Sequence, residues 1–147
     1  MARQYHQGRF TPINPQKYAG DASNIIYRSS WEKKVMIRLD TSPSVVAWSS
    51  EEHVIPYLSP IDGKIHRYFV DFVVKYKDQR TGDMKKMMIE VKPFKQTQPP
   101  VKGKRTTKRF LEESHTYIIN QAKWNSATNF ASKHGYEFKI MTEKDLF

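Results

Sequence analysis

Residues 66–92, HRYFVDFVVKYKDQRTGDMKKMMIEVK, form the stretch of sequence that decides the fold. Two runs within it, 66–77 and 86–92, have the alternation expected of strands, and the turn-like residues 78–83 separate them. Five apolar residues share one face of the first predicted strand: Tyr68, Val70, Phe72, Val74 and Tyr76. The simplest structure for such a pair of runs is an antiparallel hairpin.

Three charged residues stand out in this hairpin. Asp71 lies between Phe69 and Val73 on the first strand, in an apolar setting where an unpaired acid would be costly to bury. Glu90 and Lys92 are two positions apart on the second strand, so they share a face and their Cα atoms are roughly 6 to 7 Å apart. Both can therefore reach one small site.

The remaining elements extend outward from the hairpin. Ser29 and Glu32 have the spacing of a capping box, and apolar residues then recur at helical intervals up to Pro43. The same reasoning predicts helices at 30–40, 112–133 and 142–147, and further strands at 45–48, 54–57 and 136–140. This order predicts an α/β fold, a single domain with a mixed central sheet flanked by helices.

The chain is long enough for one domain. It has 147 residues, 38% of them hydrophobic, and the proline-containing residues 1–28 predict a basic N-terminal arm that precedes a domain at 29–147. The formal charge of +10 indicates nucleic acid or an anionic membrane as a partner. No apolar run of membrane-spanning length or signal core occurs, so nucleic acid is favoured. The absence of cysteine excludes disulfides and thiolate zinc sites.

Asp71 and Glu90 are suited to hold Mg²⁺, because this hard cation prefers oxygen ligands and keeps several water molecules. Lys92 could polarise an attacking water or offset charge that builds on a phosphate. Glu32 could add a carboxylate from the first helix, but its role as the capping partner of Ser29 is also adequate. Equally, an E-x-K triplet on a strand is often a solvated charge pair.

The stretch after Pro93 is strongly basic. Residues 91–111 contain no acid, and we expect six of their cations to contact DNA phosphates: Lys95, Lys102, Lys104, Arg105, Lys108 and Arg109. The alternative is a solvated surface loop without a partner. The proximity of this loop to a phosphate-handling site favours the nucleic-acid interpretation.

The order of the acids and the lysine resembles the PD-(D/E)XK nuclease pattern: Glu32, then Val70-Asp71, then Glu90-Val91-Lys92. Val70 stands where the motif has proline. The surrounding strings are similar to the endonuclease subunit of heteromeric transposases, and most of the chain resembles the head completion nucleases of T-even-like tailed phages. The resemblance implies a restriction-endonuclease-like fold. It also implies metal ligation by the three acids and the Val91 carbonyl, with Lys92 serving the water.

Many members of this superfamily place a glutamine on the helix after the lysine strand, where it contacts the site. Gln121 has that position here, although an ordinary exposed helix residue is the alternative, and the tyrosine of the fuller pattern is absent. The resemblance also implies a role in finishing DNA-filled phage heads, with portal or neck proteins as partners. The place of action would be the cytoplasm of the infected bacterial host or the virion.

The leading hypothesis is a Mg²⁺-dependent DNA endonuclease or end-trimming nuclease, in which Mn²⁺ can replace Mg²⁺. One rival is a non-catalytic DNA-binding or capsid-neck structural protein with the same fold. A second rival is the cutting subunit of a multi-protein, transposase-like complex.

Overall fold

A computed structural model describes residues 7–146. Its centre is a four-stranded sheet in the order β3-β6-β7-β8. The strands are β3 (Val45–Ser50), β6 (Phe72–Lys77), β7 (Met84–Val91) and β8 (Glu137–Met141). β6 is antiparallel to both β3 and β7, whereas β8 runs parallel to β7, so the sheet is mixed.

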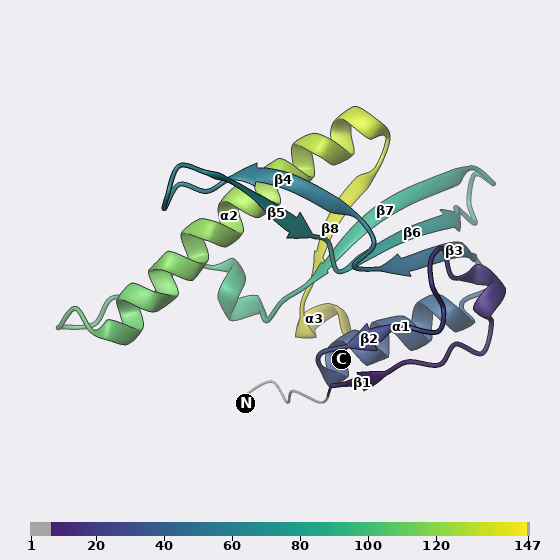
Figure 1. Cartoon of the computed structure of the whole chain (residues 1–147), viewed down its shortest axis with the longest axis horizontal. Coiled ribbons are helices and arrows are strands. Elements are labelled where there is room, and N and C mark those ends of the chain that lie inside the picture. Colours follow the sequence, from purple (N-terminus) through teal and green to yellow (C-terminus); the bar gives the residue numbers. More distant parts are fainter. Residues whose placement is uncertain (1–6, 147) are drawn as a thin grey trace.

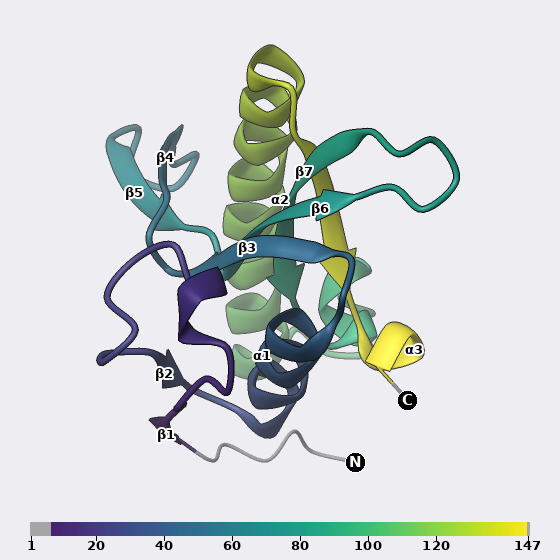
Figure 2. The ribbon, with the colours of Figure 1, turned by 90° about the vertical axis from the view of Figure 1, so that its right-hand side faces the viewer.

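A helix covers each face of this sheet, as Figures 1 and 2 show. On one face, α1 (Ser30–Thr41) contributes Val35, Met36 and Leu39 to a cluster with the sheet residues Phe72, Val74, Ile89 and Val91. On the other face, α2 (Lys108–His134) contributes Trp124, Ala127 and Ala131 to a cluster with Val70 and Met88. The predicted mixed α/β arrangement with helices around a central sheet is confirmed.

The predicted hairpin is present as β6 and β7. Its register pairs Phe72 with Ile89 and continues outward to Lys77 and Met84. At the turn, the Asp78 N–H donates to the Asp83 carbonyl at 2.8 Å, and Gly82 has φ of 76°, a conformation that favours glycine. This local chemistry fixes the register, and the register sets the positions of the acids.

The single strand predicted at 66–77 is wrong, because the chain breaks there into β5 (Ile65–Phe69) and β6. β5 pairs with β4 (Val54–Leu58) in a separate two-stranded sheet. Ser50 pairs with Phe72 but Val54 pairs with Phe69, so residues 51–53 lie opposite residues 70 and 71, as in a β-bulge. Strands β3 to β6 thus form one long hairpin, bent at this bulge.

The bend also redirects the apolar face. In an unbroken strand Tyr68, Val70, Phe72 and Val74 would share one core, but the first two pack with α2 and the last two with α1. Glu51 lies at the bend with φ of 54°, uncommon for a residue with a side chain, and its N–H donates to the Asp71 carbonyl at 3.1 Å. Asp71 is therefore at the bend itself.

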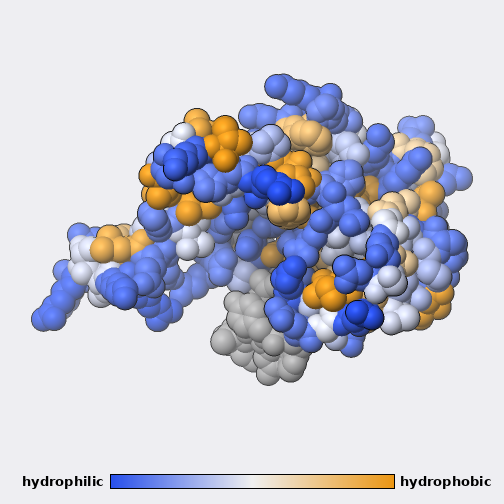
Figure 3. Space-filling model, in the orientation of Figure 1, coloured by the Kyte–Doolittle hydropathy of each residue, from blue (hydrophilic) through white to orange (hydrophobic). Residues whose placement is uncertain are grey.

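The outer face of the β4–β5 hairpin is apolar and open to solvent. The register places five apolar residues and one cation on it: Val54, Pro56, Leu58, Ile65, Arg67 and Phe69. Figure 3 shows a hydrophobic patch over this part of the molecule. The inner face carries Ile55, Tyr57 and Tyr68, which pack with α2, so the hairpin is held by its inner face alone.

Helix α2 begins four residues before the predicted start at Glu112. The Thr107 hydroxyl caps it by accepting the Phe110 N–H at 3.0 Å, and Gly135 ends it with φ of 76°. Lys108 and Arg109 therefore lie in the first helical turn and not in a loop. No helix within residues 7–146 is both long and apolar enough to cross a membrane.

The segment predicted as an arm contributes to the core over residues 7–28, while residues 1–6 lie outside the described part. It contains β1 (Gly8–Arg9), the 3₁₀ helix η1 (Pro15–Lys17) and β2 (Ile26–Tyr27). Phe10 and Tyr18 make edge contacts with Trp48, at ring separations of 5.9 and 4.8 Å. The buried Asp40 carboxylate accepts the N–H groups of Ile13 and Asn14, at 2.7 and 3.1 Å. These contacts tie the segment to α1 and β3.

Candidate active site

The bend places Asp71 against β7. Its Oδ2 accepts the Val91 N–H at 2.8 Å, and the register that pairs Phe72 with Ile89 brings Asp71 opposite Glu90. Glu90 is only 4% exposed, on the sheet face that α2 covers. The structure therefore brings together the two acids that the sequence predicts as metal ligands.

The surroundings of Asp71 disfavour its negative charge. Burial raises the pKa of the Asp71 carboxyl well above its usual value, and the charges of Glu90 and then Glu32 raise it further. The Val91 N–H and the Lys92 ammonium act in the opposite direction but do not offset these effects. A cation bound here would stabilise the ionised form of Asp71. A strongly shifted pKa of this kind is typical of functional sites.

Glu90 is also incompletely satisfied. Within residues 7–146 its Oε1 is buried with no donor in hydrogen-bonding geometry, although the Tyr68 hydroxyl neighbours the carboxylate, and its Oε2 lies 3.9 Å from the Lys92 Nζ. A buried carboxylate oxygen without a donor is rare in proteins, and a hard cation is a suitable ligand for it. The predicted common face of Glu90 and Lys92 is thus realised, with both side chains largely buried.

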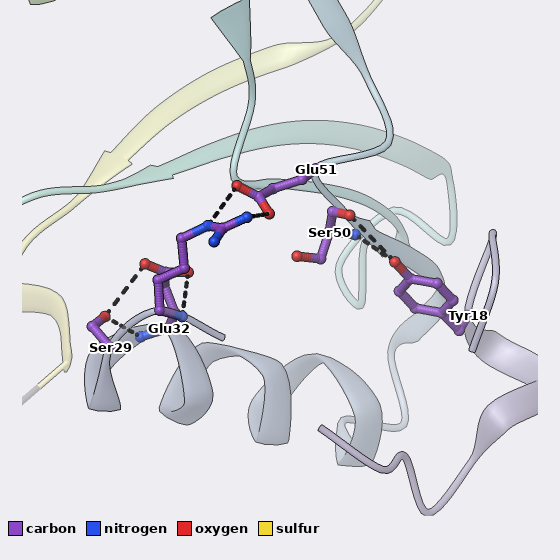
Figure 4. Close-up of polar contacts among 6 residues, drawn as sticks. Tyr18, Ser29, Glu32, Ser50 and Glu51 are labelled. Carbon is purple, nitrogen blue, oxygen red and sulfur yellow. Dashed lines mark hydrogen bonds and ion pairs between the residues drawn. The ribbon is translucent and has the colours of Figure 1, made fainter. Parts of the chain in front are cut away.

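Glu32 has the capping role and also lies near the site. Its N–H donates to the Ser29 hydroxyl at 3.2 Å, and its carboxylate accepts the Arg28 N–H at 3.2 Å and the Ser29 hydroxyl at 3.4 Å. Figure 4 shows Glu32 and Ser29 at the start of α1, with Glu51 of the bend above them. Its charge acts on Asp71, so the capping contacts hold a third acid beside the other two.

Within residues 7–146, no three acidic or histidine side chains already have the spacing of a metal cage. Asp71 lies directly before β6, where the register would continue to Glu90, whereas the Glu32 carboxylate is engaged by residues 28 and 29 at the start of its own helix. Asp71 with Glu90 is therefore the better candidate pair for holding a metal ion.

Lys123 is a residue near the site that the sequence does not single out. It lies on α2, half-buried, with its Nζ 5.6 Å from the Tyr68 ring and 5.8 Å from the Tyr57 ring. Burial lowers its pKa, the Lys92 charge lowers it further, and Glu90 and Asp71 raise it. Lys123 thus adds a second ammonium to the field of the acids. No sequence signal identifies it, because only the packing of α2 against β5 brings it there.

Arg28 and Tyr68 also belong to this neighbourhood. Arg28 pairs with Glu51 through Nε at 3.2 Å and Nη2 at 3.0 Å, and Glu51, Glu32 and Asp71 together raise its pKa. Burial raises the pKa of the Tyr68 hydroxyl, with Glu90 the next cause. The bend is therefore surrounded by charged and polar groups from four separate elements.

Gln121 has a different location. It lines a small cavity of about 280 Å³ next to β8, together with Thr97, Trp124, Asn125, Thr128, Phe138 and Ile140. In the described part of the chain its side chain forms no hydrogen bond or ion pair with the acids or with Lys92. On the same helix it is Lys123, two residues further on, that interacts electrostatically with them.

The six predicted DNA-contacting cations divide into two groups. Three of them pair with acids of α2: Lys95 with Glu113 at 3.9 Å, Arg109 with Glu113 at 3.5 Å and Lys108 with Glu112 at 3.9 Å. Lys102, Lys104 and Arg105 are exposed between the 3₁₀ helix η2 (Phe94–Thr97) and α2, and they make no ion pair within residues 7–146. The second group is therefore better placed to bind phosphates.

Comparison with known proteins shows the family of the chain. The family model described as TnsA-like endonuclease N terminal matches residues 42–143, which include Asp71, Glu90 and Lys92 but not Glu32. The chain is 42% identical over 145 residues to the head completion nuclease of Enterobacteria phage T4, and the alignment covers 96% of this chain and 93% of that protein. The chain therefore belongs to the TnsA-like endonuclease family and is a relative of the phage T4 head completion nuclease.

Proposed function

We propose that this protein is a Mg²⁺-dependent deoxyribonuclease with the PD-(D/E)XK fold, which cuts or trims DNA during phage head completion. The observation that carries the proposal is the meeting of Asp71 and Glu90 at the bend, where the Asp71 carboxyl has a raised pKa and one Glu90 oxygen is buried with no donor in hydrogen-bonding geometry among residues 7–146. The name of the phage relative supplies the biological setting. Contacts with portal or neck proteins, in the infected cell or in the virion, would follow from that setting.

The residues present fit a hard divalent cation. Asp71 and Glu90 would hold it, with the Val91 carbonyl and Glu32 as further oxygen donors, and Mn²⁺ suits the same oxygen set. Bound Mg²⁺ supplies Lewis acidity, which lowers the pKa of a coordinated water and offsets charge on the phosphoryl oxygens.

Lys92 acts next to these ligands. Its ammonium is held 3.9 Å from the Glu90 Oε2, which orients it toward the same pocket. There it donates to the attacking water or to a phosphoryl oxygen and stabilises negative charge as that charge develops. Lys123 adds positive charge from α2. We assign no catalytic step to Gln121, whose side chain lies in the cavity beside β8.

The DNA backbone would lie along the exposed cations Lys102, Lys104 and Arg105. These residues recognise phosphates and not bases, so the proposal includes little sequence preference. Binding is then expected to weaken steeply with salt, because neutralising phosphates releases counterions.

The test is cleavage of linear and supercoiled DNA with Mg²⁺ by the wild-type protein, Glu90→Gln and Lys92→Ala, with Glu137→Gln as a matched surface control. We expect both site variants to lose at least about a hundred-fold in rate while still binding DNA, and the control to retain activity. Full activity in Glu90→Gln would remove the assignment. If the wild type binds DNA but neither cleaves it nor binds Mn²⁺, the non-catalytic alternative is favoured. If the wild type binds Mn²⁺ but is inactive, a nuclease that needs a partner is favoured.

A further inference from the structure

A second cavity lies beside the candidate active site. It has a volume of about 720 Å³ and lies between residues 93–101 and the first half of α2. Pro93 at one end directly follows Lys92, and Asn120 on the helix lies one turn before Lys123. A ligand in this cavity, which we call the α2 cavity, would therefore be a near neighbour of a phosphate at the acids. Figure 1 shows η2 and the chain after it beside this half of α2.

The walls of the α2 cavity are suited to a flat apolar ring. Its apolar lining consists of aromatic and proline side chains with one valine: Pro93, Phe94, Pro99, Pro100, Val101 and Tyr117. The Lys144 Nζ lies 3.4 Å from the centroid of the Phe94 ring and covers one face of it, but Phe94 is still 36% exposed, so part of the ring remains available for contact. Aromatic surfaces of this kind stack on nucleobases with little regard to sequence.

The charges in the α2 cavity balance. Lys95 and Arg109 line it, but so do Glu112 and Glu113, and Glu113 lies within 3.9 Å of the Lys95 Nζ and 3.5 Å of the Arg109 Nε. A phosphate would meet acids as well as cations there, whereas Lys102 and Lys104 make no ion pair with an acid within residues 7–146. The α2 cavity is therefore better matched to a neutral group than to a phosphate.

The cavity also offers an unsatisfied donor. Asn120 is 4% exposed and lines the cavity, and its buried Nδ2 has no hydrogen-bond partner in the part of the chain that the structure describes. An unsatisfied buried amide is costly, so a ligand acceptor that reaches it is favoured. Gln96 and Gln98 add further amide groups to the lining. A nucleobase has both the flat ring and the ring-nitrogen and carbonyl acceptors that this lining requires.

We propose that the α2 cavity receives an unpaired nucleobase of the DNA substrate next to the cleaved phosphate, so that the protein prefers DNA ends with single-stranded overhangs. The inference rests on the proposed nuclease function and names its substrate class. A paired base must first be extruded from the duplex, whereas an unpaired base enters at lower cost, and this difference produces the preference. The exposed cations then hold the phosphates of the same strand.

The test measures DNA binding without cleavage, by fluorescence anisotropy in EDTA. Three DNAs with equal numbers of phosphates are compared: a duplex with a thymidine overhang, the same duplex with an abasic overhang, and a blunt duplex. We expect the wild type to bind the thymidine overhang roughly five-fold to a hundred-fold more tightly than the abasic one. Tyr117→Ala removes a stacking surface and Asn120→Asp replaces the amide donor, so both should lose most of this preference.

Ile118→Ala is the matched control, because Ile118 is 44% exposed on the same helix and does not line the cavity. Equal binding of thymidine and abasic overhangs by the wild type would overturn the inference, and so would a preference that both cavity variants retain. Either result can coexist with Mg²⁺-dependent cleavage, which tests the nuclease proposal separately. Circular dichroism establishes whether each variant folds. If Tyr117→Ala does not fold, Asn120→Asp alone tests the inference.

Discussion

Replacing Asp71 by asparagine should abolish cleavage and at the same time make the metal-free protein more stable. The Val91 N–H now donates to the Asp71 Oδ2 at 2.8 Å, and an asparagine carbonyl oxygen can accept the same bond. The change therefore keeps this hydrogen bond and removes only the charge of the partly buried carboxylate and its repulsion by Glu90. Removing a buried charge that is only partly compensated is worth about 1 to 3 kcal/mol.

The sign follows from linkage. The pKa of Asp71 in the folded protein is raised above its ordinary value of 3.8, so the folded state holds the proton more tightly than the unfolded chain. Ionised Asp71 thus lowers stability, an effect that is absent below about pH 4 and complete above the raised pKa. The stability advantage of Asp71→Asn over the wild type should therefore be negligible at low pH and grow as the pH rises.

The assay is thermal unfolding in EDTA across this pH range, repeated with Mg²⁺ at neutral pH. For a chain of this length we expect Asp71→Asn to raise Tm by roughly 3 to 10 °C in EDTA. Mg²⁺ should raise the Tm of the wild type but not of the variant, since it binds only the intact folded site. Asp83→Asn, the same change at an exposed turn, is the control. A destabilised Asp71→Asn, or an equal Mg²⁺ effect on both proteins, would refute the reasoning.

Three other perturbations test separate parts of the structure. Lys123→Met should slow single-turnover cleavage by about ten-fold to a hundred-fold, with Lys123→Arg intermediate, and an unchanged rate would exclude a role for its charge. Simultaneous alanine substitution of Lys102, Lys104 and Arg105 should reduce the slope of log affinity against log salt by roughly 0.9 for each phosphate that is no longer neutralised. Lys108→Ala should change this slope less, because Lys108 is paired with Glu112. Phe10→Ala should lower the free energy of unfolding in urea by about 3 to 5 kcal/mol and Ile13→Ala by under about 0.5, and equal small effects would mean that the N-terminal segment adds little to the core.

The hairpin and its acids could be predicted from the sequence because alternation with period two is a local signal. The turn at 78–83 and the alternation around Glu90 determine the pairing of β6 with β7, and that pairing positions Glu90 and Lys92. The break after Phe69 could not be predicted, since Val70 and Asp71 continue the alternation of an unbroken strand. It depends on the extra residue in the opposing segment 51–53, which becomes apparent only when both strands are paired.

The helix that covers the site is harder to predict. Basic residues are unfavourable in the first turn of a helix because of the helix dipole, so Lys108 and Arg109 do not indicate that a helix begins there. The helix nevertheless begins at Lys108, where Thr107 caps it. Which face of α2 meets the sheet depends on tertiary packing. Trp124 is 5% exposed and packs in the core with the sheet, whereas the apolar Ile118 is 44% exposed. The sequence points to Gln121 through the family resemblance, whereas the packing of α2 is what brings Lys123 near the acids.

The bend between β5 and β6 has a consequence for how this chain can vary in length. The β4–β5 hairpin pairs with no strand of the four-stranded sheet, and its base is closed by the bonds from the Glu51 N–H to the Asp71 carbonyl and from the Val70 N–H to the His53 carbonyl. Insertions or deletions at its tip, residues 59–64, would leave those closing bonds and the Phe72–Ile89 register in place. Loop length can thus diverge freely there without moving the acids.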